Sequence, residues 1–157
     1  MSANYGCPQD VEVERPRRYV EMVNGIESWH QYGIRIPSVY PEIGGSTVVN
    51  AGTPLNLHVA VDVRRDPQRA PQCIFASCWT NIKTEENPCG IWKEVFLPLN
   101  PDVSSSVHDN RDVLQYIYQA SLVPTVCDTY RMTFLLKWNH LLLWFNEFGN
   151  DAFVDVV

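Results

Sequence analysis

The sequence predicts a single all-β domain, an immunoglobulin-like β-sandwich of about seven to nine antiparallel strands. Short apolar segments alternate with polar residues at a period of two, and turn residues separate these segments at regular spacing. An amphipathic helix longer than two turns is not evident in the pattern. Hydrophobic residues make up 45 % of the 157 positions, which is enough for a core. A sandwich is favoured over an up-and-down barrel, because a barrel would show more uniform hairpins.

The clearest strand is expected at residues 55–63. Leu55, Leu57, Val59, Val61 and Val63 alternate there with polar or small residues. Strict alternation predicts one buried face and one face in water. Further strands are expected at residues 73–82, 92–99, 114–122, 130–138, 141–145 and 153–157.

The N-terminal part is less regular. Residues 1–18 are polar and are expected to form a flexible arm, so that residues 19–157 make up the single domain. Asn-Gly at positions 24–25 lies between apolar runs and predicts a hairpin within residues 19–36, with a short helix as the alternative. Residues 37–45 contain two prolines and two glycines and are expected to be a loop.

Charge and cysteine usage restrict the partners and the location. The net charge of −6 argues against nucleic acid, which requires clustered Lys and Arg. No segment is long and apolar enough to predict an integral membrane protein, and the N-terminus does not have the pattern of a signal peptide. The five cysteines include no C-x-x-C pair. We therefore expect a cytoplasmic protein with reduced cysteines.

The sequence contains no recognisable catalytic constellation. No P-loop, G-x-G-x-x-G or G-x-S-x-G motif is present. The four histidines, His30, His58, His108 and His140, do not show metal-ligand spacing. We expect a protein that is not an enzyme and needs no cofactor and no metal.

Two acidic loops leave a calcium site as an alternative. Asp102, Asp109, Asn110 and Asp112 lie in one loop, and Asp62 and Asp66 lie near another turn. Calcium takes six to eight oxygen ligands from such loops. However, Asp and Ser populate turns for backbone reasons alone, and this simpler explanation is favoured.

The aromatic residues are the main candidates for a binding surface. Trp79, Trp92, Trp138 and Trp144 lie on or beside expected strands, and any one of them could simply be a core residue. In the 73–82 segment, Phe75 and Trp79 fall on the face opposite the apolar residues, and in the 92–99 segment Trp92 and Phe96 do the same. Either residues 19–45 cover this second face, or it presents aromatic rings to a partner.

The C-terminal stretch resembles the ending of starch- and glycogen-binding β-sandwich modules. Residues 130–134 read Tyr-Arg-Met-Thr-Phe, residues 144–151 read Trp-Phe-Asn-Glu-Phe-Gly-Asn-Asp, and residues 154–156 read Val-Asp-Val. The resemblance implies that Trp144 stacks on a sugar ring and that Asn146 and Asn150 supply polar contacts. It also implies that Trp79, Trp92 or Trp138 adds a second aromatic platform.

These observations predict a non-catalytic module that binds carbohydrate, with α-glucan as the first ligand to test. The alternative is a protein-interaction or assembly subunit that uses an exposed edge strand or the aromatic face. A small β-sandwich enzyme or a calcium-dependent membrane binder is the third possibility. The expected partner is therefore a polysaccharide or another protein.

Overall fold

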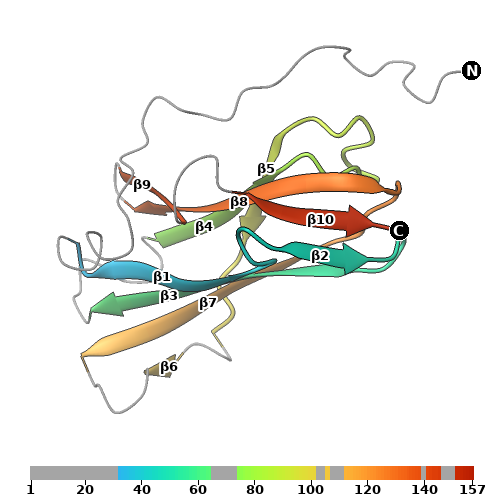
Figure 1. Ribbon diagram of the computed structural model, residues 1–157. Coiled ribbons are helices and arrows are strands. Elements are labelled where there is room, and N and C mark those ends of the chain that lie inside the picture. The colour runs from blue at the N-terminus through green and yellow to red at the C-terminus, as the bar shows by residue number, and fades with distance from the viewer. Residues whose placement is uncertain (1–31, 65–73, 102–104, 107–111, 139–140, 146–150) are drawn as a thin grey trace, which may run out of the picture.

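The computed structural model describes residues 32–64, 74–101, 105–106, 112–138, 141–145 and 151–157. These residues form ten strands in two layers (Figure 1). The strands are β1 (Ile34–Tyr40), β2 (Ser46–Val49), β3 (Leu55–Arg64), β4 (Ile74–Thr80), β5 (Lys93–Leu97), β6 (Ser105–Ser106), β7 (Val113–Leu122), β8 (Asp128–Trp138), β9 (Leu141–Trp144) and β10 (Ala152–Val156).

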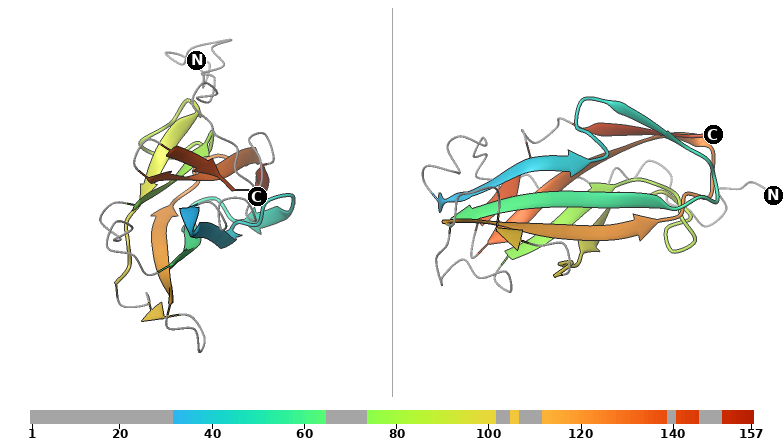
Figure 2. Two further views of the ribbon diagram at one scale, coloured as in Figure 1. Left: turned by 90° about the vertical axis from the view of Figure 1, so that its left-hand side faces the viewer. Right: turned by 90° about the horizontal axis from the view of Figure 1, so that it is seen from below.

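The strands pair into a four-stranded and a six-stranded sheet. The four-stranded sheet has the order β1-β3-β7-β6. The six-stranded sheet has the order β2-β10-β8-β4-β5, and β9 pairs with β8. The two sheets lie face to face, as the view along the strands shows (Figure 2, left). The prediction of an all-β sandwich is therefore confirmed.

The strand order agrees with an immunoglobulin-like arrangement. Immunoglobulin-type sandwiches place strands A, B, E and D in one sheet and C, F and G in the other. The chain follows this order, with β1, β3, β7 and β6 in one sheet and β4, β8 and β10 in the other. Tyr130 at the start of β8 is buried, and its hydroxyl donates a 2.7 Å hydrogen bond to the carbonyl of Val126. A tyrosine in this position is a recurrent feature of such sandwiches.

One strand pair departs from the predicted antiparallel pattern. β2 runs parallel to β10, with Ser46 opposite Phe153 and Val49 opposite Val156. The chain therefore begins in one sheet with β1 and continues in the other with β2. The prediction of purely antiparallel strands is wrong at this pair.

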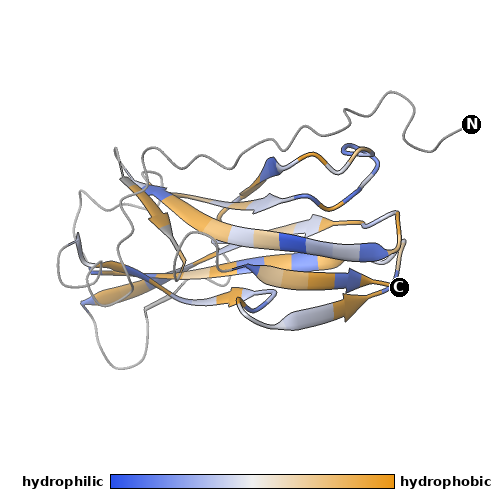
Figure 3. Ribbon diagram, turned by 45° about the horizontal axis from the view of Figure 1, so that its top comes forward, coloured by the Kyte–Doolittle hydropathy of each residue, from blue (hydrophilic) through white to orange (hydrophobic). Residues whose placement is uncertain are grey.

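The core lies between the sheets and follows the period-two pattern. Leu55, Leu57, Val59, Val61 and Val63 of β3 are each at most 2 % exposed. They face the apolar side chains of the other sheet, which include Ala76, Cys78, Met132, Phe134 and Leu136. Hydrophobic residues recur along the strands of both layers (Figure 3). The alternation in these segments is thus the origin of the sandwich.

The prediction of a loop at residues 37–45 is wrong for its first part, because β1 continues to Tyr40. The register between β1 and β3 shifts between Arg35 and Ser38, which places Pro37 in a bulge on an edge strand. A proline is tolerated there because no ladder bond requires its missing N–H. The expected arm and hairpin lie mostly in residues 1–31, outside the described residues.

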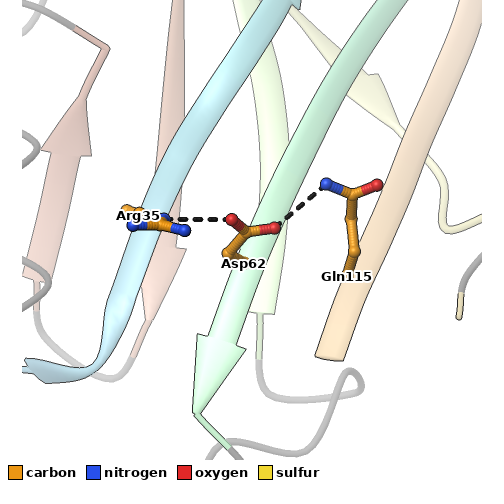
Figure 4. Close-up of polar contacts among 3 residues, drawn as sticks. All are labelled: Arg35, Asp62 and Gln115. Atoms are coloured by element: carbon orange, nitrogen blue, oxygen red, sulfur yellow. Dashed lines mark hydrogen bonds and ion pairs between the residues drawn. The ribbon is translucent and has the colours of Figure 1, made fainter. Parts of the chain in front are cut away.

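The outer face of β3 is less exposed to water than its polar residues predict. Asp62 is 2 % exposed. Its carboxylate accepts a 3.0 Å hydrogen bond from Arg35 Nε on β1 and another of 3.0 Å from Gln115 Nε2 on β7 (Figure 4). One carboxylate therefore ties together three adjacent strands of the four-stranded sheet.

The cysteines differ from the expectation of a fully reduced set. Cys78 is buried in the core as a free thiol, and burial raises its pKa, while Cys127 is free and exposed. Cys89 is joined in a disulfide. This bond contradicts the expectation of reduced cysteines and removes the reason that the cysteine pattern gave for a cytoplasmic location.

Candidate functional site

Phe75, Trp79, Trp92 and Phe96 lie on the outer face of the six-stranded sheet, on or beside β4 and β5, and we call these four side chains the aromatic face. On β4 the side chains of Ile74, Ala76 and Cys78 are buried in the core. Successive side chains of a strand point to opposite faces, so those of Phe75 and Trp79 lie on the outside. Phe96 on β5 is paired with Ser77 and lies on the same outer face.

Phe75 and Phe96 form an exposed pair at one end of the aromatic face. Their side chains are 49 % and 56 % exposed. The ring centroids lie 6.3 Å apart with an interplanar angle of 45°. Aromatic pairs at this distance contribute about 0.5–1.5 kcal/mol beyond their buried area. The pair is therefore held in place while much of its apolar surface remains in contact with solvent.

Trp79 occupies the centre of the aromatic face. Its neighbours in register are Glu94 on β5 and Thr133 on β8. The indole Nε1 of Trp79 is buried and has no hydrogen-bond partner, and the same holds for the hydroxyls of Ser77 and Thr133, within the part of the chain that the structure describes. Buried polar groups are normally hydrogen-bonded. The base of the aromatic face thus has hydrogen-bonding capacity that its own neighbours leave unmet.

Trp92 and the charged residues form the border of the aromatic face. The guanidinium carbon of Arg131 lies 5.5 Å from the ring centroid of half-buried Trp92, within the range of a cation–π contact. Lys137 Nζ lies 2.8 Å from a carboxylate oxygen of Glu94, and both side chains are partly exposed. The border therefore presents both signs of charge beside the rings.

The structure brings two of the six predicted site residues, Trp79 and Trp92, to this surface. Trp138 lies on the inner side of β8, is 9 % exposed and packs edge-to-face on Tyr32 with ring centroids 6.1 Å apart. Its ring belongs to the core and does not offer a surface platform.

The resemblance-based residues are only partly described. Trp144 ends β9, and its backbone pairs with that of Leu135 on β8. Its side chain, and the whole of Asn146 and Asn150, lie outside what the structure describes. Their expected role in sugar binding stays a prediction.

The suggested cover of the aromatic face, residues 19–45, is also partly described. Residues 34–40 of this segment form β1 and pair with β3 in the other sheet, so this part does not lie over the aromatic face. Residues 19–31 lie outside the described residues.

Side chains that could ligate a metal do not gather in the described residues. Within the described ranges, no cluster of three or more His, Cys, Asp or Glu is placed to hold a metal ion. Asp62, one of the acidic residues considered for calcium, is hydrogen-bonded to Arg35 and Gln115 instead. Asp66, Asp102, Asp109 and Asn110 lie outside the described residues. No helix among the described residues is long and apolar enough to cross a membrane.

The sequence predicts the outer position of Phe75 and Phe96, but it does not lead us to name them among the ligand-binding residues. Both lie in segments whose tryptophans are candidates, and both occupy the same alternating position as Trp79 or its cross-strand neighbours. The period-two pattern that places Trp79 on the outer face is therefore sufficient to include them.

Comparison with known proteins gives no family assignment. No protein-family model matches the chain, and no curated protein matches it. Among solved structures, a family 123 glycoside hydrolase from Clostridium perfringens is similar over 71 % of this chain and 22 % of its own, with 10 % identity and a TM-score of 0.36. AggA, the major subunit of aggregative adherence fimbriae type I from Escherichia coli, is similar over 79 % of this chain and 95 % of its own, with 10 % identity and a TM-score of 0.28. Both TM-scores lie below 0.5, so neither likeness supports a statement about function.

Proposed function

We propose that the chain is a non-catalytic carbohydrate-binding module that binds α-glucan through the aromatic face. The observation that carries the proposal is the placement of Trp79 and Trp92 outside the core, on one face of the six-stranded sheet. A pyranose has an apolar C–H face that an indole ring can cover, as an exposed aromatic covers other apolar ligand surfaces. The choice of α-glucan comes from the C-terminal resemblance.

The polar groups around the rings support a sugar as the ligand. Glu94 accepts hydrogen bonds, whereas Arg131 and Lys137 donate them, and all three are partly exposed beside the aromatic rings. A sugar ring presents an apolar face bordered by hydroxyl groups that both donate and accept. The alternation of rings and polar groups on this face matches that chemistry.

Titration with maltoheptaose, followed by tryptophan fluorescence and calorimetry, tests the proposal. We expect Trp79→Ala and Trp92→Ala each to weaken binding about fivefold or more, because truncating an aromatic anchor costs over about 1 kcal/mol. Val48→Ala, at a 65 % exposed position of β2, is the matched surface control and should bind like the wild type. Trp79→Phe keeps an aromatic ring at this position and should therefore retain more of the binding than Trp79→Ala. Circular dichroism checks that each variant is folded.

A silent fluorescence titration, together with unchanged mobility in native gels containing amylopectin, would overturn the carbohydrate proposal. Equal affinity of the wild type, Trp79→Ala and Trp92→Ala would instead overturn its location on the aromatic face.

A second candidate function is protein interaction through the exposed Phe75–Phe96 pair. Protein interfaces are enriched in aromatic residues at their centre, with polar groups at the rim. Light scattering of the wild type and of Phe75→Ser/Phe96→Ser tests self-association. A concentration-dependent increase in mass that the double variant abolishes supports this function. A monomer at all concentrations, with no partner in a pull-down, opposes it.

A further inference from the structure

A separate groove lies on the outer face of the four-stranded sheet, away from the aromatic face. It has a volume of about 560 Å³ and is lined by side chains of three adjacent strands. Tyr40 of β1, His58 of β3 and Gln119 of β7 lie in one row, and Asn56 and Ser121 lie in the next. We call these five residues the polar groove. Its size is within the usual range of about 300–1,000 Å³ for small-molecule sites.

The polar groove offers hydrogen-bonding groups without formal charge. None of the described residues that line it is an Asp, Glu, Lys or Arg. Burial lowers the pKa of His58, so its imidazole is neutral near pH 7 and has one donor and one acceptor. Such a lining lacks the cation that an anionic ligand needs and is too polar for a purely apolar one.

Two amide side chains are held in position with their donors available. The Ser121 hydroxyl donates a 2.7 Å hydrogen bond to Asn56 Oδ1. Asn100 Nδ2 donates a 2.8 Å hydrogen bond to Gln119 Oε1. Each bond occupies the amide oxygen and leaves the NH₂ group of Asn56 or Gln119 free to donate to a ligand.

His58 lies beside both amides, opposite Gln119 and two residues from Asn56 on β3, and its hydrogen-bonding capacity is not fully used. Its Nε2 is buried and has no hydrogen-bond partner, as judged over the residues that the structure describes. A nitrogen in this condition gains from a ligand hydroxyl, because burying a polar atom without a partner is costly. His58 therefore adds a third polar contact between β1 and β7.

Tyr40 supplies the apolar contact. Tyr40 is 43 % exposed and lies on the edge strand β1, opposite His58 of β3. We propose that the polar groove binds one neutral pyranose ring, with the Tyr40 ring over the C–H face of the sugar and Asn56, His58 and Gln119 bonded to its hydroxyls. This site is independent of the aromatic face, because the two lie on different sheets.

Two-dimensional NMR of the ¹⁵N-labelled full chain tests this site. The probes are glucose, galactose, N-acetylglucosamine and maltose at millimolar concentration, with inorganic phosphate as a charged comparison. We expect at least one sugar to shift the backbone amide resonances of Asn56, His58 and Gln119, and phosphate to leave them unchanged. Tyr40→Ala should weaken this binding about tenfold, whereas Tyr40→Phe should preserve it.

The variant Val48→Ala is the matched control, because this exposed position lies on the other sheet and its substitution should leave binding in the polar groove unchanged. Sugar-induced shifts confined to the Trp79 and Trp92 indole resonances would support the proposed function and overturn the second site. Shifts confined to the polar groove would support the second site and overturn the location of the proposed function. The second site would also be overturned by the lack of any shift at the groove with every sugar, by a response to phosphate instead, or by equal affinity of the wild type and Tyr40→Ala.

Discussion

Replacing Asp62 with alanine tests whether one buried carboxylate holds the four-stranded sheet together. The Asp62 side chain is 3 % exposed and accepts hydrogen bonds from both neighbouring strands. Its two partners differ in their surroundings, since the Arg35 side chain is 42 % exposed and Gln115 is only partly exposed. The substitution removes both bonds. Water can then reach the exposed guanidinium of Arg35 more easily than the amide of Gln115.

The expected loss of stability follows from these contacts. A hydrogen bond to a charged group contributes about 1.5–3 kcal/mol. Because water can solvate the guanidinium of Arg35 after the substitution, we assign the bond between Arg35 and Asp62 less than about 1.5 kcal/mol. The sum for Asp62→Ala is then about 2–4 kcal/mol. For a chain of this length, each kcal/mol lowers the melting temperature by about 2–4 °C, which predicts a decrease of roughly 5–15 °C.

Urea unfolding of four proteins measures this contribution. The wild type, Asp62→Ala, Arg35→Ala and the double variant form a thermodynamic cycle, and Asp62→Asn keeps the shape while removing the charge. Asp62→Ala breaks both bonds, whereas Arg35→Ala leaves the buried carboxylate with its bond to Gln115 but without its cationic partner, and the cycle separates these two costs. An Asp62→Ala protein within about 0.5 kcal/mol of the wild type would refute the reasoning, since that is the range of an ordinary surface substitution.

Two further predictions concern Tyr130 and Asp155. Tyr130→Phe removes the hydrogen bond to the Val126 carbonyl and should lower the free energy of unfolding by about 0.5–1.5 kcal/mol, as measured with urea. Hydrogen bonds from Ser46 and Thr129 lower the pKa of the Asp155 carboxyl below its ordinary value of 3.8. The ionised Asp155 carboxylate therefore stabilises the fold fully at pH values above 3.8. This stabilisation is lost as the pH falls through the lower pKa of the folded state. Asp155→Asn should flatten the decrease in stability in this acid range, and an unchanged slope would contradict the assignment.

The long central strands could be predicted from the sequence because their partners impose a simple pattern. In β3 and β8 the buried face alternates with the outer face over ten or more residues. Short edge strands carry no such signal. β2 has four residues and pairs with β10, which lies about a hundred positions further along the chain. β1 contains Pro37, which favours a loop unless the bulge and the edge position are known.

The burial of Asp62 illustrates a limit of local patterns. Its position in the alternation correctly places it on the outer face of β3. Its low exposure depends on Arg35 and Gln115, which are 27 and 53 residues away in the sequence. A pattern within one strand cannot identify neighbours supplied by other strands.

The candidate sites also contain some residues that the pattern within one strand predicts and others that it does not. The alternation places Trp79 correctly on the outer face, because its position alternates with core residues of β4. Trp138 shares the alternating position of Phe134 and Leu136, and this signal by itself indicates the core. Tyr40 is not among the predicted residues because it falls in the expected loop. The polar groove needs three strands in register, and no single segment of the sequence reveals it.

The parallel pairing of β2 with β10 determines how the fold would respond to a pulling force. The N-terminal ends of the two strands lie together, with Ser46 opposite Phe153, and so do their C-terminal ends. Tension applied through the start of β2 and the end of β10 therefore slides one strand along the other. This shear loads the ladder bonds and the flanking bonds from Phe153 to Gly45 and from Val157 to Val49 at the same time. An antiparallel pair loaded at adjacent ends would open one bond after another. Forced unfolding is controlled by the unfolding rate, so this pair sets a mechanical resistance that equilibrium stability alone does not describe.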